Sequence, residues 1–521
     1  MDKKNAAAQW TAVLVIALLP ALVLFWLVPF VSDTTIGNDY GVFPISQQME
    51  LAWSQKHGSF PLYAPGFAMG RSQAALTMGQ AFHPISHIAA ALPGYWDGHA
   101  LSLNTLLRLV SLAMAHLLIF FFLRRLKLSI LPAFLISFLA VYNMRMLDLF
   151  RYGASLENYT GYLFLCASIG FLFIERRSRV AAPLAVIAST WLLVCGGHPQ
   201  MMYLGLLGAA LVAVAIPFVL PTIDPTLADG LTIRRRVAFL AVVALCVLAG
   251  IAMSAAYVAS FYFEFVADNA LRVDQDYAWS LAYCDTPGGV INSLFSPLQA
   301  DVHGAFGSSQ LLLATVAVPA LWLIGVWVPL PILALILTCA AIFLCTAGEA
   351  TPLHRLFWEY VPLAQTFRTP GRMSMMLPFL LLLIFAWLFS PQRIRALGKR
   401  ELPFGALALP ALVGAIALVV YHEYLADLLP PPSRYTPAVI IGEKMRDAAL
   451  FAAYEKFVPY TWHLGLASLV LAFFYALHIK WKPGLWKGVF GFLLCASVVV
   501  QVTRQLRFGT WQVKVTPSKT L

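Results

Sequence analysis

Apolar residues in this chain fall into long, nearly uninterrupted runs that are separated by polar connections. The runs are about 18–22 residues long, and a helix of that length crosses a bilayer with its backbone hydrogen bonds satisfied internally. The pattern therefore predicts an all-α polytopic membrane protein with a bundle of about 13 transmembrane helices. We expect them near residues 10–31, 101–123, 129–147, 159–175, 180–197, 200–220, 237–259, 309–327, 329–347, 374–390, 403–421, 460–479 and 488–503.

Composition agrees with this pattern. Of 521 residues, 60% are hydrophobic and 11% are charged, and the mean hydropathy of +0.77 excludes a soluble globular domain. The seven cysteines form no CxxC pair, so we expect neither a disulfide framework nor a thiolate metal site. The net charge of +11 reflects the sorting of basic residues between the two sides of the membrane, and we expect no nucleic-acid partner.

Basic residues concentrate in every second connection between the predicted helices, and short basic connections face the cytoplasm. The N-terminus is therefore expected in the cytoplasm, and the long connections 32–98, 260–308, 348–373 and 422–459 outside it. We interpret the chain as a multi-pass protein of a bacterial cytoplasmic (inner) membrane. The tail from Arg504 falls outside by parity, although it is basic. The basic segments are Lys3/Lys4, Arg124 to Lys127, Arg176 to Arg179, Arg234 to Arg236, Arg393 to Arg400 and Lys480 to Lys487.

The first long connection contains two carboxylates, Asp33 and Asp39, just after the first predicted helix. Asp39 lies between Gly-Asn and Tyr-Gly, so a turn aspartate is one interpretation. Segment 44–53 has apolar residues at helical spacing, which is typical of a helix lying in the membrane interface. A carboxylate between a spanning helix and an interfacial helix is well placed to meet a lipid headgroup, and this is the functional interpretation of Asp39.

Four stretches follow one another along the chain. The first is Asp39 with Phe43-Pro44, then Gly58-Ser-Phe-Pro61-Leu-Tyr63-Ala-Pro65-Gly and Gly70. The others are Gln80-Ala-Phe-His83-Pro84, Gly196-Gly-His198-Pro-Gln200 and Val361-Pro-Leu-Ala-Gln-Thr-Phe367-Arg368-Thr-Pro370-Gly-Arg372. In this order they resemble the GT-C-type integral membrane glycosyltransferases, most closely the YfhO-like group. Tyr63 stands where that group usually has tryptophan.

The resemblance implies a GT-C-like catalytic region over residues 1–390, which includes the outer connections 32–98, 260–308 and 348–373. Residues 391–521 would add C-terminal transmembrane helices and a short tail. The implied reaction moves a sugar, with inversion, from a polyprenyl-phosphate-linked donor to an extracytoplasmic glycan, lipid or protein acceptor, in contact with membrane lipids.

In that reaction Asp39 would be the general base that takes the proton of the acceptor hydroxyl. Asp33, six residues earlier, is the competing candidate, and the spacing to the following proline favours Asp39. No metal ligand is assigned and no cofactor is certain, although a divalent metal is compatible with the resemblance.

Arg368 and Arg372 stand on the outer side, against the general distribution of basic residues, with Pro370 between them. Because of this proline, a turn leading into the next helix is favoured over one helical face. Two guanidinium groups could grip the donor phosphate, whereas the alternative is snorkelling of arginine to the headgroups. His198 and Gln200 could hydrogen-bond the phosphate or the sugar, and helix capping is the alternative for His198.

Several histidines and one arginine lie in or beside the apolar segments. His83 is a candidate for contact with substrate, and together with His87 it has the spacing of a metal pair, but no further ligands accompany them. Arg108 and His116 are expected to be buried polar anchors that face the interior of the bundle.

The short connection before the helix at 159–175 carries four charges. Asp148 and Glu157 could hold a metal or the acceptor, as a second acid does in some GT-C enzymes. The alternative is that they form salt bridges with Arg145 and Arg151.

Two other classes fit the composition. A transporter or flippase of lipid-linked precursors would use discontinuous helices and polar groups near mid-membrane. This chain gathers its polar groups in outer connections, which favours chemistry at the surface. A non-catalytic polyprenyl-phosphate-binding protein of the cell envelope is the third interpretation, and Tyr63 in place of tryptophan leaves it open.

Overall fold

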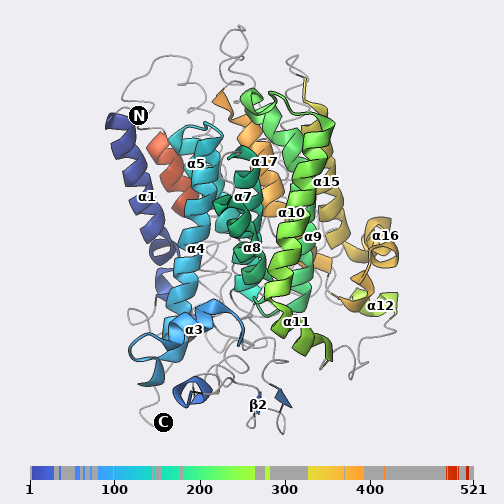
Figure 1. Ribbon diagram of the computed structural model, residues 1–521. Coiled ribbons are helices and arrows are strands. Elements are labelled where there is room, and N and C mark those ends of the chain that lie inside the picture. The colour runs from blue at the N-terminus through green and yellow to red at the C-terminus, as the bar shows by residue number, and fades with distance from the viewer. Residues whose placement is uncertain are drawn as a thin grey trace.

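The computed structural model is dominated by a bundle of helices (Figure 1). It describes residues 3–28, 34–36, 53–58, 63–64, 71–72, 80–97, 99–143, 146, 150, 155–175, 180–263, 276–281, 327–368, 370–391, 416, 489, 491–500, 503 and 512–514.

The helices of the bundle are α1 (Lys3–Val23), α4 (Ala100–Arg125), α5 (Ile130–Val141), α7 (Ser155–Ile174), α8 (Ala181–Val194), α9 (Pro199–Ile223), α10 (Ile233–Met253), α15 (Leu330–Thr346) and α17 (Leu377–Leu388). Shorter helices are α3 (Pro84–Ala90), α11 (Ala255–Phe261), α12 (Tyr277–Ser280) and α16 (Pro352–Tyr360). Turns of 3-10 helix are η1 (Phe25–Leu27), η3 (Tyr95–Asp97), η4 (Pro225–Leu227), η7 (Gly348–Ala350), η8 (Ala364–Thr366) and η9 (Pro370–Met376).

Four helices among the described residues are long and apolar enough to cross a membrane: Ser102–Arg125, Pro199–Ile223, Ile233–Met253 and Pro370–Leu388. Shorter apolar helices cover Ala7–Val23, Ile130–Val141, Ala181–Val194, Leu330–Thr346 and Gly491–Val500. The protein is thus a helical membrane protein, as the apolar runs predict. The number 13 stays a prediction, because the segments expected near 309–327, 403–421 and 460–479 lie outside the described residues apart from residues 327 and 416.

One expected helix ends early, and another is divided into two. Helix α5 stops at Val141 rather than near 147, because the Asn143 side chain forms hydrogen bonds with backbone groups at this end of the helix. Its Nδ2 donates to the Ala140 carbonyl at 3.1 Å, and its Oδ1 accepts from the Met146 N–H at 2.8 Å. The helix expected over 237–259 is divided at Ser254, whose hydroxyl donates to the Gly250 carbonyl at 3.0 Å.

Helix α7 lies at the centre of the bundle, between α4 on one side and α8 and α9 on the other (Figure 1). The close approach of α7 to α8 depends on Gly161, where a Cβ would lie 2.7 Å from the Leu193 backbone. Helix α10 approaches α8 in the same way, since a Cβ on Gly250 would lie 2.7 Å from the Ile187 carbonyl. Small residues at these crossings allow backbones to meet closely, which is how helices associate in lipid.

Ion pairs join connections at the end of the bundle where α1 begins. Arg125 pairs with Glu175 at 3.1 Å, and Lys127 pairs with Asp224 at 2.7 Å. These contacts bring the α4–α5 connection, the end of α7 and the end of α9 together, in agreement with the predicted sorting of basic loops. That this end faces the cytoplasm stays a prediction.

Two short antiparallel pairs of strands add to the expected all-α fold. Strand β1 (Thr34–Ile36) pairs with β4 (Gln512–Lys514), and β2 (Tyr63–Ala64) pairs with β3 (Arg71–Ser72). The first pair brings the C-terminal segment beside the start of the first long connection.

Candidate functional site

The residues expected to carry chemistry divide into two groups. Asp33, Asp39 and Asp148 lie outside the described residues, as do Arg145, Arg151 and all but residue 53 of the interfacial segment 44–53. The others are described: His83, Glu157, His198, Gln200, Arg368 and Arg372. They lie on α7, α9, α3 and η9, or on the residues that immediately precede these elements.

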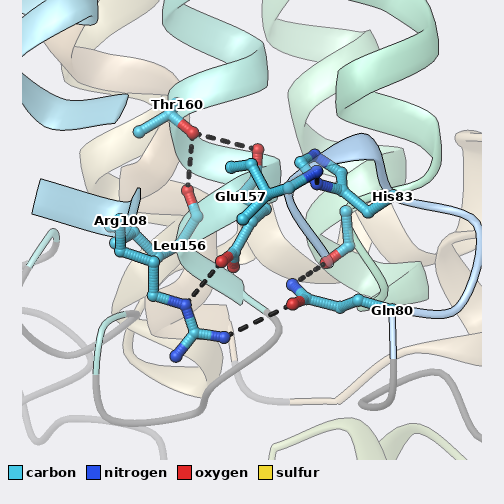
Figure 2. A network of polar contacts seen from close by, with 8 residues as sticks. Gln80, His83, Arg108, Leu156, Glu157 and Thr160 are labelled. Atoms are coloured by element: carbon cyan, nitrogen blue, oxygen red, sulfur yellow. Dashed lines mark hydrogen bonds and ion pairs between the residues drawn. The ribbon is translucent and has the colours of Figure 1, made fainter. Parts of the chain in front are cut away.

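A buried ion pair connects α4 to α7 (Figure 2). Arg108 Nε donates to Glu157 Oε1 at 2.5 Å, and each side chain is only 1% exposed. Arg108 Nη2 donates to Gln80 Oε1 at 3.3 Å, and Gln80 Nε2 donates to the Gly196 carbonyl at 3.1 Å. The chain of bonds therefore joins the segment before α3, the helices α4 and α7, and the connection between α8 and α9.

The expected burial of Arg108 and His116 is confirmed, since both are within the bundle. Glu157 Oε1 points into the bundle and meets Arg108, whereas Arg145 and Arg151, its expected partners, lie outside the described residues. Glu157 Oε2 is buried and has no hydrogen-bond partner among the described residues. A buried ion pair is costly to desolvate, so this contact is weak evidence for net stabilisation, but removing one partner would leave an uncompensated charge between α4 and α7.

Asn158, next to Glu157, fixes the connection between α8 and α9. Its Nδ2 donates to the Leu193 carbonyl at 2.7 Å, and its Oδ1 accepts from the His198 backbone N–H at 3.0 Å. A Cβ on Gly196 would lie 2.6 Å from the Asn158 backbone nitrogen, so glycine is required for this approach. The roles of Asn158 and Gln80 are not predicted by the sequence. The available signal was a run of polar residues in the first turn of an otherwise apolar helix.

Four of the predicted residues form what we call the cationic cluster: His198, Gln200, Arg368 and Arg372. Arg372 Nη1 donates to Gln200 Oε1 at 2.7 Å and lies 3.4 Å from His198 Nε2. Gln200 Nε2 donates to the Arg368 carbonyl at 2.6 Å. A single buried amide thus orients one arginine through its guanidinium and fixes the backbone of the other.

The cationic cluster stands at the first turn of α9, where backbone N–H groups and the helix dipole favour an anion. Arg368 is exposed, and its guanidinium carbon lies 6.0 Å from the centre of the Trp279 ring. The predicted turn between the two arginines is confirmed, since Arg368 precedes the 3-10 helix η9 and Arg372 lies within it. His198 occupies the N-cap position of α9 but makes no side-chain cap hydrogen bond.

His83 is buried beside the Arg108 network, and it caps α3 by accepting the Ile85 N–H on Nδ1. Burial, followed by repulsion from Arg108 and from His87, lowers the pKa of His83 to about 3. Its ring is therefore neutral at physiological pH. His87 bonds to Ala81 and Gln55 instead of sharing a ligand with His83. No group of three or more metal-binding side chains occurs in the part of the chain that the structure describes.

Three of the four stretches that carry the resemblance are in contact. Gln80 of the second stretch bonds to Gly196 of the third, and Gln200 of the third bonds to Arg368 and Arg372 of the fourth. Segments more than a hundred residues apart therefore build one end of the bundle. Comparison of the chain with protein-family models, with curated proteins and with solved structures finds no match.

Proposed function

We propose that this protein is an integral membrane glycosyltransferase that uses a polyprenyl-phosphate-linked sugar and acts at the outer face of the cytoplasmic membrane. The observation that carries the proposal is the cationic cluster. It combines two arginines, an amide and a histidine with the positive end of α9, at a helix terminus of a membrane bundle.

A phosphate or diphosphate headgroup suits this arrangement. The guanidinium of Arg372 is held in place by Gln200, so it loses little freedom when it meets a phosphate oxygen. Arg368 is exposed and could approach the same headgroup from the aqueous side. In a sugar transfer these cations would stabilise the negative charge that develops on the phosphate leaving group.

The base of the reaction is proposed to be Asp39, with Asp33 as the competing residue. The base must take the proton of the acceptor hydroxyl as its oxygen attacks the anomeric carbon. The bond from that carbon to the phosphate oxygen then breaks, and the cations of the cluster retain the released phosphate.

Binding of a polyprenyl phosphate to the purified full-length protein tests the cationic cluster. A charge-assisted hydrogen bond contributes about 1.5–3 kcal/mol, so Arg372→Gln should weaken binding by about tenfold to a hundredfold. The matched control is Arg355→Gln, an exposed arginine that pairs with Glu359 on α16. Equal affinities for wild type and Arg372→Gln would remove the cluster as the phosphate site.

Turnover with a polyprenyl-phosphate sugar tests the chemistry separately. Asp39→Asn should leave phosphate binding near normal while turnover falls by about a hundredfold or more. Full activity in this variant would transfer the role of base to Asp33. Phosphate binding with no transfer to any acceptor would favour a lipid-precursor flippase or a non-catalytic binding protein.

A further inference from the structure

Helix α16 differs from the bundle helices in the distribution of its side chains. It projects from the side of the bundle next to α15 (Figure 1). Its inner face packs on α12: His354 Nδ1 lies 3.3 Å from the Tyr277 hydroxyl, and the Trp358 ring meets Tyr277 edge to face. Burial lowers the pKa of His354 to about 4, so this inner face is neutral at physiological pH.

The exposed side of α16 is divided into two flanks. Arg355 and Glu359 form an ion pair one turn apart at 2.8 Å and occupy one flank. Leu356 and Tyr360, also one turn apart, occupy the other and are 48% and 76% exposed. Successive residues of a helix are about 100° apart, so the charged pair and the apolar pair lie side by side along the helix.

Helix α15, which precedes α16 in the chain, carries a stripe of exposed apolar residues. The exposed residues of α15 recur every three or four positions and are all apolar: Leu330, Ala334, Leu337, Ala341 and Leu344. Apolar side chains that are exposed on an apolar helix of a membrane bundle face hydrocarbon. Thr351, the N-cap residue of α16, donates its hydroxyl to the Leu344 carbonyl at 2.8 Å, which ties α16 to the end of this stripe.

We propose that α16 is an interfacial helix that lies along the membrane surface, with Leu356 and Tyr360 in the acyl chains of the adjacent leaflet. The Arg355–Glu359 pair then lies among the headgroups. This division, with aromatic residues at the boundary, is what an amphipathic helix in the interface requires. Lipid therefore covers the apolar flank. This placement of α16 does not depend on whether the protein transfers a sugar.

An interfacial α16 also fixes the depth of the cationic cluster. The chain leaves α16 and reaches Arg368 through η8, and the Tyr203 hydroxyl of α9 donates to the Pro362 carbonyl at 2.8 Å. Phe367 packs on the Tyr203 ring, with ring centres 5.1 Å apart. A helix held at the surface by lipid would therefore hold Arg368 at headgroup level.

Photo-crosslinking of the full-length protein in phospholipid vesicles tests the proposal. Benzoylphenylalanine is introduced at Tyr360, where it replaces one aromatic ring with another, and at Leu356. The matched control position is Glu359, on the charged flank of the same helix. Irradiation should increase the mass of the Tyr360 and Leu356 proteins by one phospholipid, whereas the Glu359 protein, whose probe lies at headgroup level, should gain this mass in several-fold lower yield.

Three outcomes would overturn the proposal. A crosslink from Tyr360 or Leu356 to a second copy of the chain, or to another protein, would make the flank a protein interface. A lipid adduct of equal yield at Glu359 would show that the helix has no preferred side. The absence of an adduct at both apolar positions, in protein with unchanged elution and melting temperature, would place the flank in water.

Discussion

Breaking the buried ion pair between Arg108 and Glu157 gives the sharpest test of the packing. Both side chains are 1% exposed, so neither charge can be hydrated without opening the α4–α7 contact. Removing one partner of such a pair costs about 3–5 kcal/mol, because the remaining charge stays buried. Arg108→Met and Glu157→Met should each destabilise the protein by this amount.

The double variant Arg108→Met/Glu157→Met distinguishes the energetic cost of an unpaired buried charge from the cost of lost side-chain volume. It leaves no buried charge at this position, and two methionines fill a similar space. The double variant still loses the bond from the Arg108 guanidinium to Gln80 Oε1, and this costs about 1–3 kcal/mol. The double variant should therefore be more stable than either single variant.

Apparent melting temperatures of the purified proteins in one detergent provide the ranking: wild type, then the double variant, then the two single variants. If the effects of the two single substitutions simply added in the double variant, the residues would not be coupled. If all four proteins melted together, α4 and α7 would not meet through this pair.

Three further predictions concern individual contacts. Gly196→Ala should cost about 1–3 kcal/mol, because the new Cβ meets the backbone of Asn158; an unchanged melting temperature would contradict this. The folded-state pKa of His83, about 3, lies below the 6.5 of an unfolded histidine, so its neutral ring costs no stability above pH 6.5. As the pH falls below that value, the free energy of unfolding should decline by about 1.4 kcal/mol per pH unit. A series of melting temperatures from pH 7.5 to 4.5 would reveal this slope, and His83→Gln should remove it. Asp224→Asn should cost at most about 1 kcal/mol in the same assay, because Lys127 is 53% exposed, and a larger loss would show that this pair is less solvated than its geometry indicates.

Hydropathy predicts the helices that cross the bundle, but it misses the interruptions. Helix α4 begins and ends within two residues of its expected limits. The ends of α5 and α10 were missed because Asn143 and Ser254 bond locally to the backbone. An average over a window of apolar residues does not register such a bond, although asparagine and serine are known competitors of the helix ladder.

The sequence predicts which residues belong to the candidate site, but it does not predict which side chains contact one another. His198, Gln200, Arg368 and Arg372 were identified by their order along the chain, and the structure brings them together. The pairing of Glu157 with Arg108 was not predicted, because Arg145 and Arg151 lie closer along the chain. Arg108 is 49 residues away on another helix, and only the packing of α4 on α7 reveals the contact.

The first turn of α7 explains how three distant segments are held at one end of the bundle. Adjacent residues on a helix point about 100° apart, so Glu157 can face α4 while Asn158 faces the connection between α8 and α9. Glu157 acts through Arg108 and Gln80 on the Gly196 carbonyl, and Asn158 holds the His198 backbone directly. Both routes end on backbone atoms of the segment that opens α9. The geometry around His198 is therefore set by side chains one turn inside the bundle, which position the cationic cluster without belonging to it.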